Sequence, residues 1–390
     1  MKNRILFVTS ALQVIIAKAS IDHLNYKDEQ DYRTYVLMIH PSLNQNSKNG
    51  IEYYSNKFNF YKIIDLTYFF KEKKKKEFNY RLNFFKFFIL KVKNIKMNMY
   101  FNNTERPNII LEISKFIKTN IGDTDEIFIR TNYKVLDLAF YESISNIKKI
   151  NVIEDGYYDY LNNYYFSKIF KYQRVKQFVI NRSYAYLIFL LSFFKTFKLK
   201  QSIKNNLRYQ IKYSNKFNSF NSKNSINIGS RIKKNFKKYS EIEDNNKNII
   251  IIIGTVFWDW EISNDDEALI YNDLIEKIKK KYLTKNSNIF YKPHPRCRNL
   301  EFKKINLNCE FFEKMHNVLI EEYFSKYNVN AVYSFGSTSS LYSKILFNIP
   351  SYFIDITKFK RGNTNFNYKI LRDDEFMIFK KYGVKKVTIT

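Results

Sequence analysis

The chain has 390 residues, 45% of them hydrophobic, and a formal net charge of +29 at neutral pH. It is longer than one hydrophobic core usually supports, so we expect two domains. With only 8 glycines and 5 prolines, the composition argues against disorder and low-complexity linkers. The large positive charge indicates a polyanionic partner or an anionic membrane surface.

The cysteines and the apolar segments indicate in which cellular compartment the protein is expected. Cys297 and Cys309 have no second cysteine pair beside them, so they favour a reducing, cytoplasmic compartment over a zinc site. The apolar stretch Ile5–Ala17 imitates a signal peptide, but Gln13 interrupts it, and we interpret it as a strand followed by a helix. The stretch Tyr184–Phe194 is too short to span a bilayer, which leaves peripheral contact with the anionic inner membrane as the expected membrane interaction.

Strand-like and helix-like segments alternate along the first part of the chain. The strand-like segments are Ile5–Thr9, Tyr35–Ile39, Tyr61–Leu66, Glu126–Arg130 and Lys149–Ile153, and helical patterns cover Ala11–Leu24 and Tyr133–Ile147. Such alternation predicts a parallel sheet with helices on both faces.

One long segment carries most of the excess charge. From Tyr160 to Ser240 there is no Asp or Glu, whereas Lys and Arg number eighteen and aromatic residues lie between them. A set of solvated basic helices would explain some of this pattern. A solvated face normally carries both signs of charge, however, so we interpret the segment as a surface that meets a polyanion.

A second alternating unit follows. Strands are predicted at Asn248–Ile253, Asn288–Tyr291, near Phe311, at Ala331–Ser334 and at Ser351–Ile354, with helices at Asp265–Tyr282, Asn317–Tyr327 and Ser339–Phe347. The predicted fold class is therefore α/β, and two Rossmann-like halves joined through the basic segment are the simplest architecture. We assign residues 1–240, with basic helical insertions, to the first domain and 241–390 to the second.

A histidine between two prolines follows one of these strands. In Lys292-Pro293-His294-Pro295-Arg296 each proline holds the preceding residue extended, so the imidazole of His294 is rigidly mounted between two cations. Such a site suits an anion. A proline-braced turn with a surface histidine is the alternative interpretation.

Two other polar clusters also stand where strands of a parallel sheet end, which is where α/β folds bind ligands. Glu154-Asp155-Gly156 follows a strand, and a buried carboxylate there would serve as a general base, although acids before glycine are also common in turns. The run Ser334-Phe335-Gly336-Ser337-Thr338-Ser339-Ser340 leads into a helix, whose N-terminal N–H groups and hydroxyls would bind phosphate.

The order of these motifs resembles that in the bacterial sialyltransferases, specifically the capsule polysialyltransferases and the related lipooligosaccharide sialyltransferases. Those families share an acidic-Gly motif, a His-Pro motif and a Ser-Ser/Thr motif on a GT-B fold. The resemblance therefore implies two Rossmann-like domains that face each other across a cleft. Thr9-Ser10-Ala11-Leu12-Gln13 is similar to their first strand-to-helix turn, and Ile320-Glu321-Glu322-Tyr323 is similar to a segment between their second and third motifs.

The resemblance implies a role for each matching residue. Glu154 would be the catalytic base that takes the proton of the acceptor hydroxyl, and His294 would stabilise or protonate the phosphate of the departing CMP. Glu321 would hold the ribose, and hydroxyls among Ser337, Thr338, Ser339 and Ser340 would bind phosphate. Gly254 and Thr255 would line the nucleotide pocket. Apart from the resemblance, their charge indicates that Lys292 and Arg296 would add positive charge beside the phosphate, and that Lys212, Arg231 and Lys234 of the basic segment would contact the acceptor. Asp155, beside Glu154, is also expected to contact the acceptor.

The function expected from this resemblance is inverting transfer of sialic acid from CMP-sialic acid to capsular polysialic acid, without a metal or other cofactor. Asp123-Thr124-Asp125 matches a metal-binding DxD pattern but precedes a strand, so we interpret it as a turn. The alternatives are a lipooligosaccharide sialyltransferase, a Kdo transferase or a polyol-phosphate polymerase. A nucleic-acid-binding protein is a more distant alternative, because no part of the chain matches a nucleic-acid module.

Overall fold

The structure is a computed structural model, and its described residues fall into two compact units. The first unit comprises Met1–Leu43, Tyr54–Asp155 and Asn162–Asn227, and the second comprises Asn44–Tyr53, Gly156–Leu161 and Ile228–Thr390. The structure describes residues 2–24, 32–39, 43, 45–68, 107–130, 149–153, 207–212, 225–240, 245–255, 262–282, 287–294, 297, 300–312, 318–356 and 376–389.

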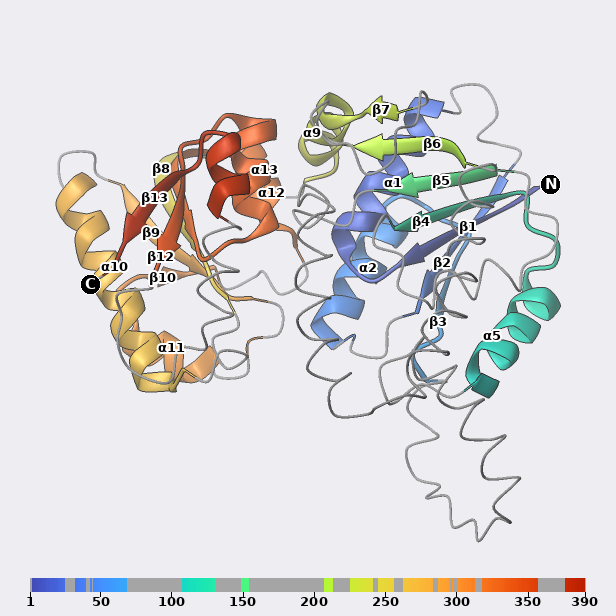
Figure 1. Cartoon of the computed structure of the whole chain (residues 1–390), viewed down its shortest axis with the longest axis horizontal. Helices are drawn as coiled ribbons and strands as arrows, with labels where there is room; N and C mark the ends of the chain where they lie inside the picture. The colour runs from blue at the N-terminus through green and yellow to red at the C-terminus, as the bar shows by residue number, and fades with distance from the viewer. Residues whose placement is uncertain are drawn as a thin grey trace, which may run out of the picture. The chain divides into compact units, whose positions relative to one another are not determined.

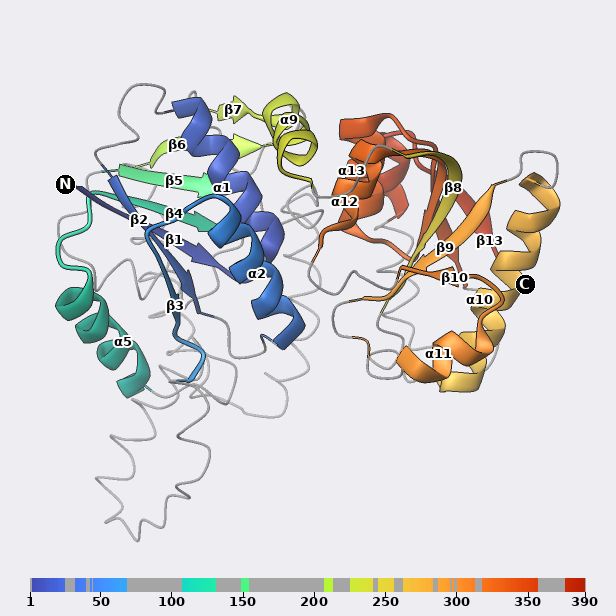
Figure 2. The ribbon, with the colours of Figure 1, turned by 180° about the vertical axis from the view of Figure 1, so that it is seen from behind.

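A parallel sheet forms the core of the first unit, in the order β3-β2-β1-β4-β5-β6-β7 (Figure 1). Its strands are β1 (Lys2–Val8), β2 (Tyr32–Met38), β3 (Lys62–Asp65), β4 (Glu126–Arg130), β5 (Lys149–Ile153), β6 (Leu207–Lys212) and β7 (Ser225–Asn227). The helices of this part are α1 (Ala11–Leu24) and α5 (Pro107–Asn120), and Figure 2 shows α1 in front of the sheet. Helix α2 (Gln45–Lys57) follows β2 in the chain, and most of its residues are assigned to the second unit. The strand order reverses between β1 and β4, as in Rossmann folds.

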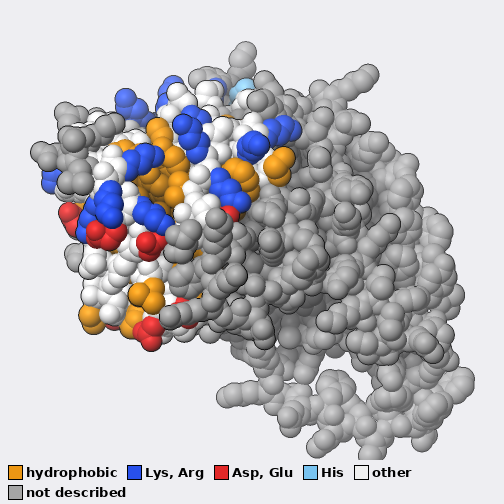
Figure 3. Space-filling model, turned by 60° about the vertical axis from the view of Figure 1, so that its left-hand side comes forward, with side chains coloured by type: hydrophobic (Ala, Val, Ile, Leu, Met, Phe, Trp, Pro, Cys, Tyr) orange, Lys and Arg blue, Asp and Glu red, His pale blue; other side chains and the backbone are white. Residues whose placement is uncertain are grey.

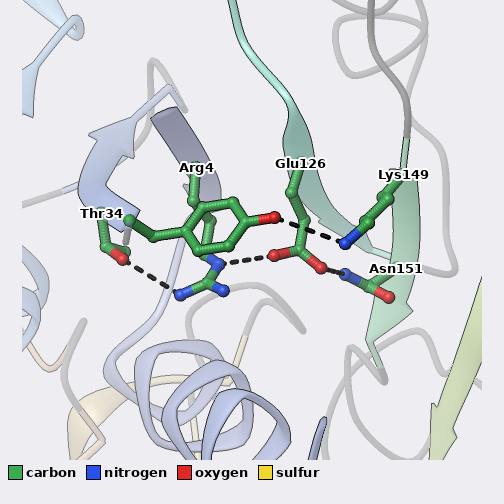
Figure 4. Close-up of polar contacts among 6 residues, drawn as sticks. Arg4, Thr34, Glu126, Lys149 and Asn151 are labelled. Atoms are coloured by element: carbon green, nitrogen blue, oxygen red, sulfur yellow. Dashed lines mark hydrogen bonds and ion pairs between the residues drawn. The ribbon is translucent and has the colours of Figure 1, made fainter. Parts of the chain in front are cut away.

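A buried polar cluster joins the starts of four strands in this sheet (Figure 4). Arg4 Nε contacts Glu126 Oε2 at 2.7 Å, and both side chains are almost completely buried. The other Glu126 oxygen accepts a hydrogen bond from Asn151 Nδ2 at 2.7 Å, and Arg4 Nη1 approaches Thr34 Oγ1 at 3.4 Å. The guanidinium lies 4.2 Å from the ring centre of Tyr32. Each charge is thereby paired, as burial requires.

The second unit contains another all-parallel sheet, in the order β10-β9-β8-β11-β12-β13. Its elements are β8 (Asn245–Ile253), α10 (Asn264–Tyr282), β9 (Asn288–Lys292), α11 (Leu300–Asn306), β10 (Glu310–Phe311), α12 (Ile320–Lys326), β11 (Tyr327–Ser334), α13 (Thr338–Phe347), β12 (Ser351–Asp355) and β13 (Lys385–Thr388). Helices α10 and α11 lie on one side of the sheet, and α12 and α13 lie on the other (Figures 1 and 2).

The run of isoleucines in β8 explains why this sheet needs helices on both faces. Side chains alternate along a strand, so Ile250 and Ile252 belong to the core cluster that contains α10, whereas Ile249, Ile251 and Ile253 belong to the cluster that contains α12. Four of these five side chains are completely buried, and Ile253 is 7% exposed. A strand that is apolar on both faces is typical of the centre of a parallel sheet.

Helix α9 (Gly229–Tyr239) packs against α12 and α13, with Ile232 and Phe236 buried. The longest segment of the second unit begins at Ile228. The predicted domain boundary at residue 240 stays a prediction. The basic segment is also not entirely helical, because it contributes β6 and β7 to the first sheet.

The predicted fold class is confirmed, since both units are α/β with parallel, Rossmann-like sheets. Many predicted elements also match the structure, among them α1, β4 and β5, whose predicted bounds are those observed. The predicted helix at Tyr133–Ile147 lies outside the described residues. Among the described residues, no helix combines the length and the apolar character needed to cross a bilayer.

Candidate active site

A pocket opens in the second unit where the strand order reverses between β8 and β11. Its volume is about 290 Å³, near the lower end of the range for ligand pockets. The lining residues come from the carboxyl ends of β8, β9 and β11 and from the starts of α12 and α13: Ile253, Gly254, Thr255, Lys292, Pro293, His294, Leu319, Ile320, Phe335, Gly336, Ser337, Thr338 and Ser339. Ligands of open α/β sheets bind at this position.

The turn between β11 and α13 forms one wall of the pocket. Gly336 has a φ of 90°, a conformation that favours glycine. Ser337 is the N-cap of α13, and its side chain accepts a hydrogen bond from the Ser339 amide at 3.2 Å. The wall is therefore made of hydroxyls and the N-terminus of a ten-residue helix, both of which favour an anion.

The structure separates the serines of this turn into two groups. The hydroxyls of Ser334 and Ser340 are buried and lie 2.7 Å apart, and Ser340 also donates to the carbonyl oxygen of Ser337 at 2.8 Å. Ser334 and Ser340 therefore stabilise the turn and are not among the residues that line the pocket. Ser337, Thr338 and Ser339 are half-buried and line the pocket, so they are the hydroxyls available to a ligand.

Two buried titratable side chains, Lys292 and Glu321, influence each other electrostatically at the pocket. Lys292 is 8% exposed, and burial lowers its pKa to about 8, while the carboxylate of Glu321 acts in the opposite direction. Burial raises the pKa of Glu321, and the Ser339 hydroxyl and the Lys292 ammonium counteract this rise. Neither Glu321 oxygen accepts a hydrogen bond of normal geometry from the described residues. Lys292 lines the cavity, whereas Glu321 lies behind its wall.

Gly254 and Thr255 close the pocket at the end of β8. The Gly254 amide donates to the Lys292 carbonyl oxygen at 2.8 Å, and the Thr255 amide donates to the Tyr271 hydroxyl at 3.1 Å. A Cβ atom on residue 254 would lie 2.4 Å from Tyr291 Oη, so close packing requires glycine here. The turn is held by contacts that leave no room for a larger residue.

The pocket brings together most of the predicted donor-site residues: Gly254, Thr255, Lys292, His294, Ser337, Thr338 and Ser339. Glu321 is adjacent to them through Lys292 and Ser339. The remaining predicted donor residue, Arg296, and the predicted Glu154 and Asp155 lie outside the described residues. Their predicted roles therefore stay predictions.

The predicted acceptor residues are found in two elements. Lys212 is the last residue of β6 in the first unit. Arg231 and Lys234 belong to α9, where Lys234 is exposed and Arg231 is half-buried. Lys233, Lys234, Lys237 and Lys238, together with Ser230, line a hollow of about 440 Å³ on this helix.

Sequence reasoning missed several residues of the site. Leu319, Ile320 and Phe335 are apolar parts of the pocket wall, and Tyr271 supports it from behind. Apolar residues in a strand-to-helix turn carry no sequence signal that separates pocket wall from core. Ile320 belongs to the Ile320-Glu321-Glu322-Tyr323 segment, but no role was predicted for it, and for Leu319 the place immediately before that segment was the available indication.

The DxD pattern lies where the sequence analysis placed it, in the turn before β4. The side chain of Asn3 donates to the Asp123 carbonyl oxygen at 3.0 Å, and the Asp125 amide donates to the Asn3 carbonyl oxygen at 3.0 Å. These contacts use the backbone of both aspartates to fasten the turn to β1. No cluster of three or more potential metal-binding side chains occurs among the described residues.

Comparisons with known proteins bear on the family. The model of the alpha-2,8-polysialyltransferase family matches residues 4–355. No curated protein gives a significant match.

Among solved structures, an alpha/beta-galactoside alpha-2,3-sialyltransferase from Photobacterium phosphoreum is 16% identical, with a TM-score of 0.42, covering 99% of this chain and 98% of its own. UDP-GlcNAc 2-epimerase from Methanocaldococcus jannaschii is 14% identical, with a TM-score of 0.49 and coverage of 100% and 89%. MurG from Acinetobacter baumannii is 11% identical, with a TM-score of 0.43 and coverage of 100% and 86%.

Proposed function

The chain belongs to the alpha-2,8-polysialyltransferase family of glycosyltransferases, and on this premise we propose that it is an inverting, metal-independent sialyltransferase. The proposed donor is CMP-sialic acid, and the favoured acceptor is capsular polysialic acid. The observation that carries the proposal is the pocket between β8 and β11, in which a helix N-terminus, hydroxyls, Lys292 and His294 converge. This combination suits the phosphate of a nucleotide sugar.

The groups that line the pocket are suited to stabilise the leaving group. Inverting transfer of sialic acid develops positive charge at the anomeric carbon while the bond to the CMP phosphate breaks. The negative charge that appears on that phosphate would be stabilised by the α13 N-terminus and by the ammonium of Lys292. His294, in its protonated form, would donate a charge-assisted hydrogen bond to the same group.

The acceptor hydroxyl must lose its proton as it attacks. We assign this step to Glu154, which follows β5 directly in the sequence. A carboxylate is a suitable general base once burial or neighbouring charge raises its pKa toward the working pH. No step of this scheme needs a metal ion, so activity is expected to survive treatment with EDTA.

A basic surface supports a polyanionic acceptor. Helix α9 has no acidic residue, and its exposed lysines line the hollow described above. Figure 3 shows a face of the second unit on which Lys and Arg side chains lie around hydrophobic ones, with Asp and Glu side chains on the same face. Each sugar of polysialic acid carries a carboxylate, so several such cations would hold several sugars at once. Peripheral contact with anionic lipid would use the same chemistry.

One experiment tests the reaction. The full-length protein is incubated with CMP-sialic acid and either sialylated or lactose-terminated acceptors, and the products are sized and their linkages determined. Elongation of the sialylated acceptor with release of CMP is expected. Use of lactose-terminated acceptors alone would instead indicate a lipooligosaccharide enzyme, and no CMP release with any acceptor would contradict the proposed donor.

Two variants test the assigned residues. Glu154→Gln and His294→Ala should each lower kcat by about 10²- to 10⁴-fold, the range for general acid–base groups, while the far-ultraviolet circular dichroism spectrum stays unchanged. Near-normal turnover by either variant would contradict its assignment.

A further inference from the structure

A lysine is buried behind the pocket, away from the lining residues. Lys303 of α11 is 2% exposed, and its Nζ lies 2.6 Å from Oε1 of Glu267, which is 4% exposed and belongs to α10. The next residue, Lys304, is an exposed lysine that pairs with Glu301 on the surface at 3.2 Å. Burying a charged pair costs free energy unless its remaining hydrogen bonds are well used. The contacts of Lys303 therefore need an explanation.

One set of contacts leads from Lys303 to the Thr255 amide. Lys303 Nζ donates to Tyr291 Oη at 3.3 Å, and the Tyr291 hydroxyl is hydrogen-bonded to that of Tyr271. The Tyr271 hydroxyl in turn accepts the Thr255 amide at 3.1 Å. The Tyr271 ring also meets the Phe335 ring of the pocket wall edge-on, with 5.4 Å between ring centres. This is a continuous buried chain that ends in the pocket lining.

A second contact leads to the histidine turn. Lys303 Nζ donates to Cys297 Sγ at 3.5 Å, and the Cys297 amide donates to the His294 carbonyl oxygen at 2.8 Å. The latter bond closes the turn that begins at the histidine. The same ammonium group is thus joined to two separate parts of the pocket, one at the end of β8 and one after β9.

Tyr271 and Tyr291 are both suited to link Lys303 to the Thr255 amide through hydrogen bonds. Burial raises the pKa of Tyr271 and of Tyr291 above the ordinary value, and the carboxylate of Glu267 adds to the rise in both cases. Both hydroxyls therefore keep their protons at physiological pH and remain able to donate. Both side chains are completely buried, so water does not compete for the bonds.

We propose that Lys303 is the positioning residue of the donor pocket, because it holds both the Thr255 amide and the turn that begins at His294. The inference rests on the proposed function, since it takes this pocket to be the donor site. It assigns Lys303 no contact with substrate. Its effect is to fix two residues that line the pocket, Thr255 and His294, and such fixed geometry is required for tight binding of the leaving phosphate.

The test uses variants that separate positioning from stability. Lys303→Met alone leaves Glu267 as an unpaired buried charge and endangers folding. The double variant Lys303→Met/Glu267→Gln removes both charges, so we expect it to fold. Lys304→Met is the matched control, because it removes the neighbouring lysine from the same helix at an exposed position. Circular dichroism and thermal melting establish that each variant is folded at the temperature of the assay.

Binding of CMP to the full-length protein is then measured by titration calorimetry. We expect the double variant to bind about tenfold more weakly than wild type, the loss expected from one or two hydrogen bonds, and Lys304→Met to bind as wild type does. The donor KM should rise in parallel while the acceptor KM stays unchanged. A purely structural role would lower the melting temperature but leave the CMP affinity of the folded protein intact, and that result would overturn the inference.

A double-mutant cycle tests the route to Thr255. Tyr271→Phe removes the hydroxyl that accepts that amide and bonds to Tyr291. Adding it to the double variant should therefore cost less than the product of the separate losses. Independent, multiplicative losses would show that the two residues do not act through one chain of contacts. If wild-type protein itself binds no CMP, the proposed donor is wrong. If wild type binds CMP and the double variant binds equally well, only the role of Lys303 is wrong.

Discussion

The ammonium group of Lys292 and the carboxylate of Glu321 lie close enough to shift each other's pKa, although both side chains are buried. Burial has the larger effect on the lysine and lowers its pKa to about 8. Lys292 lines the pocket, so its charge is available to an anionic donor only while it is protonated. This relationship makes the pocket sensitive to alkaline pH.

The donor KM should therefore rise as the pH increases through about 8. Below that value Lys292 is protonated and attracts the donor phosphate, and above it the attraction is lost. A charged hydrogen bond contributes about 1.5–3 kcal/mol, so the rise should reach about 10- to 100-fold. The donor KM measured from pH 6 to pH 10 checks this. Lys292→Met should have a high KM throughout and no alkaline rise, and retention of the rise in this variant would assign it to another group.

In the variant Glu321→Gln, the alkaline rise of the donor KM should occur at a lower pH. The negative charge of Glu321 raises the pKa of Lys292, so its removal allows the lysine to lose its proton earlier. The same series of KM measurements detects the shift. Glu301→Gln, which removes an exposed carboxylate of α11, is the control and should leave the profile unchanged. An unshifted profile in Glu321→Gln would mean that the pair does not interact in solution.

The variant Gly254→Ala should lower the free energy of unfolding by about 1–3 kcal/mol, as overpacking does, and should also weaken CMP binding. The added Cβ would meet Tyr291 Oη at 2.4 Å and the Lys292 carbonyl oxygen at 3.0 Å. Gly122→Ala is an informative contrast, because φ there is 78° and a Cβ meets no atom within 4 Å. It should reduce stability through backbone strain alone and leave CMP binding intact. Urea unfolding measures the loss of stability in each variant, and calorimetry measures its affinity for CMP.

Charge reversal on α9 should weaken long acceptors more than short ones. In Lys234→Glu the exposed cation that lines the α9 hollow is replaced by an anion, which repels the carboxylates of a sialic acid chain. We expect the KM for a long oligosialic acid to rise several-fold and that for a short one to change little. Lys381→Glu reverses an exposed charge elsewhere in the second unit and is the control. Equal effects on both acceptor lengths would argue against an extended binding surface.

The variant Arg4→Met should lower the free energy of unfolding by about 3–5 kcal/mol, because it leaves Glu126 charged, buried and without its cation. The double variant Arg4→Met/Glu126→Leu removes both charges and should recover most of that loss. Denaturant unfolding measures both changes. A small effect of Arg4→Met would mean that water or another cation reaches Glu126.

Apolar patterns predicted the fold well where strands are buried on both faces. The isoleucine run of β8 and the apolar segments of β4 and β5 leave few alternatives to parallel strands. Helix α2 was not predicted, because its sequence is rich in Asn and Ser, which are poor helix formers. Its buried residues Ile51 and Tyr54 show that tertiary packing, rather than local propensity, stabilises it.

Motif order predicted the residues that meet in the pocket, because parallel strands bring their carboxyl ends to one edge of a sheet. It could not predict which lysines are buried. Lys303 and Lys304 are adjacent and chemically identical, yet only the first is buried, since only its side chain points toward Glu267 and Tyr291. The direction of a side chain from a short helix depends on how that helix packs, which no local pattern specifies.

The ion pair of Arg4 and Glu126 also has a consequence for how the first sheet assembles. Arg4 stands directly opposite Thr34 on β2 and opposite Glu126 on β4, so its partners come from parts of the chain 30 and 122 residues away. If β1 slid by one residue, the guanidinium would face the other side of the sheet and both charges would be stranded in apolar surroundings. A sheet with a shifted register is therefore less stable than the native one, and the cluster favours the correct alignment of the strands.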